Sequence, residues 1–145
     1  MSLTDNETRD LRAFAGMMIP ASADYGVPGA DNEAIFADIL RSLERDRDDI
    51  VRALARLTAL GGGAFADLSP AQRREVGESF RAEGGPALAA ITRVVLLCYY
   101  RDDRVMGSLG QEPRPPFPKG HTVEQGDWSL LDPVKKRPPF WRKAG

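Results

Sequence analysis

The segment of residues 86–100, PALAAITRVVLLCYY, is the feature that most constrains how this chain can fold. Its apolar residues recur at mixed steps of one, three and four and would cover most of a helical circumference: Leu88, Ile91, Val94, Val95, Leu97, Cys98 and Tyr99. A helix of that kind is buried on several sides. It is too short to cross a bilayer, which needs about 20 apolar residues. We therefore expect a core helix and no membrane insertion.

Two amphipathic helices are predicted near the N-terminus. The first begins at Thr4 and Glu7, which have the spacing of a capping box, and ends near Ile19 because Pro20 follows. Residues 20–30, rich in proline and glycine, are predicted to form a loop. Asp31 or Asn32 can cap the second helix. The apolar face of the second helix is predicted to be Ile35, Phe36, Ile39, Leu40 and Leu43.

Two more helices are predicted before the central one. A face of Ile50, Val51, Leu54, Leu57 and Leu60 is followed by three glycines at 61–63, which can close a helix in the left-handed conformation. The charged residues 44–49 before it form either a turn or a solvated helical section. Ser69, Pro70 and Gln72 have the pattern of a helix start. Further along that helix, Val76 and Phe80 are predicted to form its buried side.

The sequence therefore predicts an all-α fold. Its 145 residues, 42% of them hydrophobic, suffice for one core, and no segment alternates as a strand does. We expect residues 1–110 to form a bundle of about five helices, ending in a short helix whose Val105, Met106 and Leu109 face inward. Residues 111–145 are expected to form a long, proline-rich, mostly irregular C-terminal arm of the same domain.

The arm differs in composition from the body. It holds seven of the eleven prolines, both tryptophans and the single histidine. Prolines at this density prevent a continuous helix. Disordered segments are poor in aromatic residues, whereas the arm has four large aromatic side chains spaced along it. We expect the arm to be held at these aromatic positions, either across its own body or across a partner.

Charge and cysteine content exclude several functions. The net charge of −1 and the pI near 5.9 indicate no attraction to nucleic acid or anionic lipid. The single cysteine, Cys98, excludes an intrachain disulfide, and its position on an apolar helix favours inert packing over reactivity. The N-terminus lacks the pattern of a secretory signal. The chain as given is therefore expected to be cytoplasmic; the alternative is a periplasmic location, by co-export with a partner or after removal of a signal.

Several segments together resemble one known family. They are MMIPASADYGVPGA at 17–30, YYRDDRVMGSLGQEPRPPFPKG at 99–120, and GDWSLLDPV and PPFWR further on. They are similar to the gluconate 2-dehydrogenase subunit 3 family, the small or gamma subunits of bacterial flavin-dependent sugar and alcohol dehydrogenases. The resemblance extends over nearly the whole chain and is most specific at residues 19–30 and 99–141.

The resemblance implies a non-catalytic accessory subunit. Its partner would be a large flavoprotein of the glucose-methanol-choline (GMC) type, which carries FAD and the catalytic groups, and in some complexes a cytochrome c subunit takes the electrons onward. The small subunit in this family often carries a twin-arginine signal. This sequence departs from that pattern, since its first predicted helix begins almost at Met1. A stabilising role is therefore expected in preference to a carrier role, and no cofactor is expected in this chain.

The residues themselves offer little catalytic chemistry. His121 is the only imidazole, so any histidine-based triad or metal site would have to use it, and its polar, turn-like surroundings favour an exposed or interface position. Asp102, Asp103 and Arg104 are more typical of a helix cap and a surface ion pair than of an acid pair. No Glu-x-x-His pair of a di-carboxylate metal site occurs.

Aromatic and arginine side chains are the candidates for a partner interface, because Trp, Tyr and Arg carry much of the binding energy at protein contacts. The candidates are Tyr99, Tyr100, Arg114, Phe117, His121, Trp128, Phe140, Trp141 and Arg142. The clusters 99–100 and 140–141 could instead complete the core where the arm meets the body. Two hypotheses remain: an accessory subunit of a flavin-dependent dehydrogenase, or a self-contained helical protein with a homo-oligomeric or regulatory role.

Overall fold

The computed structural model describes residues 3–113, 120 and 122–139. The chain divides into two compact units, residues 1–113 and 114–145, and each is described here by itself. The described residues contain α-helices and 3₁₀-helices but no strand; a single isolated bridge joins Ser22 and Val27. The predicted all-α class is confirmed.

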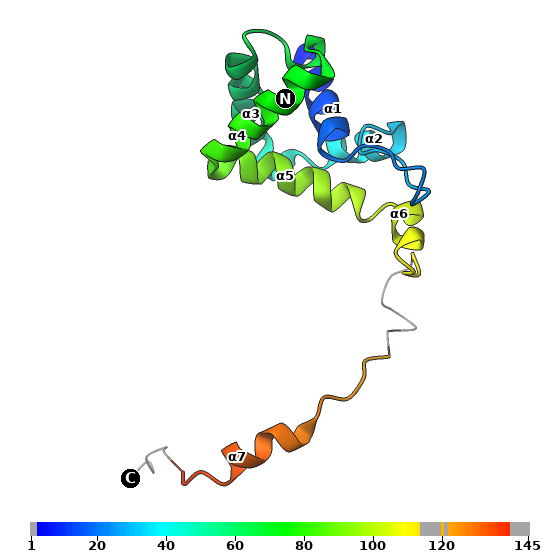
Figure 1. The fold of residues 1–145 in the computed structure, drawn as a ribbon, viewed down its shortest axis with the longest axis vertical. Coiled ribbons are helices and arrows are strands. Elements are labelled where there is room, and N and C mark those ends of the chain that lie inside the picture. The colour runs from blue at the N-terminus through cyan, green and yellow to red at the C-terminus, as the bar shows by residue number, and fades with distance from the viewer. Residues whose placement is uncertain (1–2, 114–119, 121, 140–145) are drawn as a thin grey trace. The chain divides into compact units, whose positions relative to one another are not determined.

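The first unit is a helical body (Figure 1). Within residues 3–113 it has six α-helices and two 3₁₀-helices: α1 (Asp5–Met18), α2 (Glu33–Arg41), η1 (Glu44–Asp46), α3 (Arg47–Gly61), η2 (Phe65–Asp67), α4 (Pro70–Glu83), α5 (Gly85–Tyr99) and α6 (Asp103–Ser108). Five of these α-helices are the predicted ones, and α6 is the predicted short helix after them. The charged residues 44–49 form η1 and the first turn of α3, so both expectations for that segment hold in part.

The helix starts follow from local hydrogen bonds. In α1 the backbone N–H of Thr4 donates to Glu7 Oε2 (2.7 Å), and the N–H of Glu7 donates back to Thr4 Oγ1 (3.3 Å). Ser69 and Gln72 make the same reciprocal pair at the start of α4. Such a box satisfies two N–H groups that the helix itself leaves unpaired. Of the two predicted caps for α2, Asn32 is the one that accepts from the helix, through the N–H of Ala34.

The core forms where α5 packs against α3 and α2, and where α1 and α4 close over α3 and η2. Phe14 from α1 meets the rings of Phe65 (6.0 Å between centroids) and Phe80 (6.3 Å), the second in an edge-to-face arrangement. Every residue of this core belongs to the first unit. The fully buried residues of the core are Leu11, Ala15, Ala30, Ile39, Ile50, Ala53, Leu57, Phe65, Ile91 and Val95.

Three burial predictions are wrong in part. Leu97 was expected to be buried on the central helix, but it is 57% exposed, because no other helix of the body covers that side of α5. Leu40 is 37% exposed, because it lies beside the inward face formed by Ile35, Phe36 and Ile39. On α6, Val105 is buried, but Leu109 follows the last helical residue and is 58% exposed.

The described part of the second unit has one short helical element. It consists of η3 (Trp128–Leu131) and α7 (Asp132–Lys135), and the other described residues of the arm are irregular. Asp127 caps η3 by accepting from the N–H of Ser129 (3.0 Å). The predicted mostly irregular conformation of the arm is confirmed for its described residues. Among the described residues, no helix combines the length and apolar character needed to cross a membrane.

Candidate interaction surface

One side of α5 is exposed although it is largely apolar. At about 100° per residue, positions 89, 92, 96, 97 and 100 fall on the same side of the helix. Leu96 is 36% exposed, Leu97 57% and Tyr100 53%. Toward the start of the helix this side becomes a shallow hollow, lined by Gly85, Leu88, Ala89, Thr92, Arg93, Leu96 and Leu97. We call the surface formed by these residues and Tyr100 the α5 face.

The two tyrosines at the end of α5 occupy different environments. Tyr99 is 5% exposed and belongs to the core, where burial raises the pKa of its phenol. Its ring packs edge-to-face against that of Tyr100, with 5.3 Å between centroids and an interplanar angle of 85°. Both tyrosines were predicted to lie at an interface. Tyr100 is accessible to a partner, whereas Tyr99 is buried in the core and packs against the ring of Tyr100.

Ion pairs anchor the α5 face at its middle and at its C-terminal end. Arg93 reaches back to η1 and donates two hydrogen bonds to Asp46, from Nη2 (2.5 Å) and Nε (3.2 Å). Just after the helix, Arg101 donates to Asp38 of α2 (2.5 Å). The hydrogen bonds from these guanidiniums hold the pKa of Asp46 and of Asp38 below its ordinary value. The exposed leucines are thus carried on a helix whose position relative to α2 and η1 is defined.

The acidic residues after the tyrosines have structural roles. Asp102 caps α6 by accepting from the N–H of Arg104 (3.0 Å), and its carboxylate pairs with the guanidinium of Arg104 (2.9 Å). These bonds lower the pKa of Asp102. Arg104 also donates to the side chain of Asn32 (3.0 Å), which links α6 to the start of α2. The prediction that this segment forms a cap and an ion pair is confirmed.

The arm carries a second exposed apolar cluster of its own. Trp128 is 66% exposed, and its indole N–H donates to Gln125 Oε1 (3.2 Å). Leu130, Leu131 and Val134 are 74%, 42% and 53% exposed. These four side chains come from one short helical element, η3 with α7. We call them the arm cluster; tryptophan is one of the residues that most often serve as interface anchors.

The other predicted interface residues cannot be placed in the same way. Arg114, Phe117, His121, Phe140, Trp141 and Arg142 lie outside the described residues. Leu96, in contrast, belongs to the α5 face but was not singled out from the sequence. The central helix is apolar on all sides, and a body of this size has too few helices to cover every side of it. That pattern is the signal that could have identified Leu96 as exposed.

The described residues contain no cluster of three or more histidine, cysteine or acidic side chains placed to hold a metal ion. Cys98 is 1% exposed, and burial raises the pKa of its thiol, which disfavours the reactive thiolate. Its sulfur lies 3.5 Å from Nη2 of Arg101. The geometry around Cys98 is that of a packed core residue beside an ion pair.

Comparison with known proteins yields no relative for this chain: no family model, no curated protein and no solved structure matches it.

Proposed function

We propose that this protein is a non-catalytic small subunit of a flavin-dependent dehydrogenase complex that acts on sugars or related alcohols, and that it belongs to the gluconate 2-dehydrogenase subunit 3 family. In this proposal a large flavoprotein of the GMC type holds FAD and the catalytic groups, and in some complexes a cytochrome c subunit is a further partner. The small subunit stabilises or assembles the large one.

The observation that carries the proposal is the α5 face. Leu96, Leu97 and Tyr100 are side chains that a water-soluble helix of a small body would be expected to bury. Exposed apolar side chains gathered in one place are typical of protein–protein contact sites. The face ends at Tyr100, inside the segment 99–120 that carries the most specific resemblance to the family.

The arm supports the same proposal independently. Its arm cluster displays Trp128 with aliphatic neighbours on a short helical element, within the GDWSLLDPV segment that also resembles the family. Two exposed apolar clusters on one small chain suit a subunit that contacts a larger protein at more than one place. Binding at two linked sites raises the overall affinity without requiring either contact to be strong.

The first test is a pull-down of the tagged chain from its native host, followed by an absorption spectrum and the mass of what co-purifies. We expect a protein of flavoprotein size with bound FAD. A colourless monomer or homo-oligomer would contradict the proposal and favour the alternative, a self-contained helical protein with a homo-oligomeric or regulatory role.

A matched pair of variants then tests the surface. Leu96→Glu places a charge on the α5 face, whereas Leu40→Glu places the same charge on α2 at almost the same exposure, 37% against 36%. We expect Leu96→Glu to co-purify with much less flavoprotein than the parent does, and Leu40→Glu to co-purify with as much. Circular dichroism should show that both variants are folded. Equal retention by the two variants would rule out the α5 face as the contact.

A further inference from the structure

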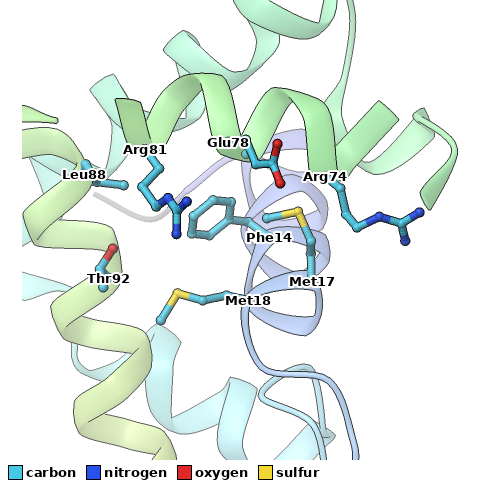
Figure 2. A pocket seen from close by; sticks show the side chains of 9 residues that line it. Phe14, Met17, Met18, Arg74, Glu78, Arg81, Leu88 and Thr92 are labelled. Atoms are coloured by element: carbon cyan, nitrogen blue, oxygen red, sulfur yellow. The ribbon is translucent and has the colours of Figure 1, made fainter. Parts of the chain in front are cut away.

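A pocket of about 420 Å³ lies between α1, α4 and α5 and shares Leu88 and Thr92 with the α5 face (Figure 2). Its apolar wall is formed by Phe14, Met17 and Met18 of α1 and by Leu88 of α5. The ring of Phe14 is buried, whereas the two methionines and Leu88 are partly exposed. Its volume is within the range of small-molecule sites, about 300 to 1,000 Å³.

The rim of this pocket holds charged side chains from α4. Arg74, Glu78 and Arg81 all line it and are exposed. Figure 2 shows the guanidinium of Arg81 beside the ring of Phe14 and directed toward the pocket, whereas Arg74 extends away at the far end. Two guanidiniums and one carboxylate give the rim a net charge of +1. That charge favours a ligand with a single negative charge.

Arg74 and Arg81 also differ from the other arginines of the body. Within residues 3–113, every other arginine forms an ion pair with a carboxylate or a hydrogen bond to a backbone carbonyl, as Arg56 does with Glu83 (2.5 Å) and Arg12 with the carbonyl of Asp31 (3.0 Å). In that same range no ion pair or hydrogen bond occupies the guanidinium of Arg81. Its donors are free to bind a carboxylate in the two-point manner that guanidinium geometry allows.

We propose that this pocket binds a free amphiphilic monocarboxylate, a small molecule with an unbranched hydrocarbon body and one carboxylate head. The hydrocarbon lies against Phe14, Met17, Met18 and Leu88, and the head accepts hydrogen bonds from Arg81. Methionine side chains suit this wall, because they are flexible and adapt to a ligand of variable shape. The proposal does not depend on the subunit role, since it concerns the isolated chain.

The geometry favours a small molecule over a polypeptide segment. Helices α1, α4 and α5 line the pocket on three sides, and the guanidinium of Arg81, which is directed into it, stands at its edge. A single headgroup at one end of an apolar body matches this arrangement. A docked helix would instead need an open groove along several turns, with apolar anchors repeated at helical spacing.

The test uses decanoate as the probe. Decan-1-ol and decyltrimethylammonium carry a neutral and a cationic head on the same ten-carbon hydrocarbon, and all three are used below their critical micelle concentrations. The protein is labelled with ¹³C at its methionine methyl groups. Met17 and Met18 report on the pocket, and Met106 of α6 serves as an internal reference. The conservative variants Met17→Leu and Met18→Leu assign the two signals.

We expect decanoate to shift the Met17 and Met18 signals saturably, to leave Met106 unchanged, and to bind more tightly than the alcohol or the cation. Arg81→Gln should weaken the binding of decanoate about threefold to tenfold, the range expected for a charged hydrogen bond at a partly exposed site. The affinity for decan-1-ol should not change. Glu78→Gln should strengthen decanoate binding. Arg52→Gln, at an exposed position of α3, is the matched control and should change neither affinity.

Three results would overturn the proposal. If the protein bound all three molecules equally, decanoate would be adsorbing non-specifically on apolar surface. The same would hold if Arg81→Gln bound decanoate as tightly as the parent does. Signals of Met17 and Met18 that ignore decanoate but shift when a co-purified flavoprotein is added would identify a polypeptide as the occupant. Failure of the pull-down with normal decanoate binding would leave this inference standing and refute the subunit role alone.

Discussion

Nε of Arg101 lies 2.5 Å from Oδ2 of Asp38, and Nη2 of the same guanidinium lies 2.6 Å from the hydroxyl of Ser42. The two charged residues are 63 positions apart in sequence, and their contact joins the end of α5 to α2. The contact holds the turn that follows Tyr100, where the α5 face ends. The orientation of that face therefore depends on an ion pair as well as on the apolar core.

Replacement of Asp38 by asparagine should remove this ion pair and make stability less dependent on pH. The pKa of Asp38 in the folded chain lies below the ordinary value of 3.8, chiefly because Arg101 donates a hydrogen bond to it. Its stabilisation is therefore complete well above that value and is lost as the pH falls through the lower folded pKa. Since the guanidinium is about half exposed and screened, we expect a cost of about 1 kcal/mol or less at pH 7.

Urea unfolding of the parent and of Asp38→Asn at pH 7, 5, 4 and 3 measures this effect. The two free energies of unfolding should converge as the pH falls below 4. Asp24→Asn, which removes the same charge from an exposed loop residue, is the control. A constant gap between parent and Asp38→Asn across this range would contradict the assignment.

The cap of α4 should contribute measurable stability. Ser69→Ala removes the hydroxyl that accepts from the N–H of Gln72, and we expect a loss of about 1 kcal/mol in the free energy of unfolding. Ser79→Ala is the matched control, because its hydroxyl only donates to the carbonyl of Glu75 within the same helix (3.0 Å). That variant should stay within about 0.5 kcal/mol of the parent. Equal losses in the two variants would show that the cap has no special role.

Gly29 should not tolerate a methyl group. A Cβ at this position would lie 2.9 Å from the backbone nitrogen of Ala21 and 2.5 Å from Oδ1 of Asp31. Because the first of these atoms belongs to the backbone, the loop of residues 20–30 would have to move. We expect Gly29→Ala to cost about 1 to 3 kcal/mol, as overpacking does elsewhere.

Gly63→Ala provides the comparison for that substitution, since no atom lies within 4 Å of a Cβ placed there. It should be neutral or should stabilise by about 0.4 to 1 kcal/mol, because alanine restricts the unfolded chain. Thermal unfolding of the two variants side by side distinguishes the steric effect from the general effect of replacing glycine. A loss at Gly63 as large as that at Gly29 would argue against the close approach.

The features that could be predicted from the sequence are those set by neighbours a few positions away. Thr4 with Glu7 and Ser69 with Gln72 act across three residues, so their capping boxes appear in the sequence directly. Helical periodicity likewise identified most of the inward faces of α2 and α3, because apolar side chains on one face must be buried together.

What the sequence could not predict depends on packing between distant segments. The apolar pattern of α5 does not say which side α2 and α3 cover, and so Leu97 was expected to be buried although it is exposed. An arginine on an amphipathic helix likewise gives no sign of whether it will find a carboxylate. Arg56 meets Glu83 from the next helix, whereas Arg81 is left facing the pocket.

A chain that ends at Pro113 should fold as stably as the full chain. Among the described residues, all those of the buried core lie before that point, and they form one continuous cluster over α1 to α6. We expect the free energies of unfolding in urea to agree within about 1 kcal/mol, close to the error of extrapolation, while co-purification of the flavoprotein falls because the arm cluster is lost. Leu57→Ala in both chains, with an expected cost of about 2 to 5 kcal/mol, verifies that the assay reports on the core. If the shortened chain instead lost much of its stability, the arm would be a structural part of the body, as the self-contained alternative requires.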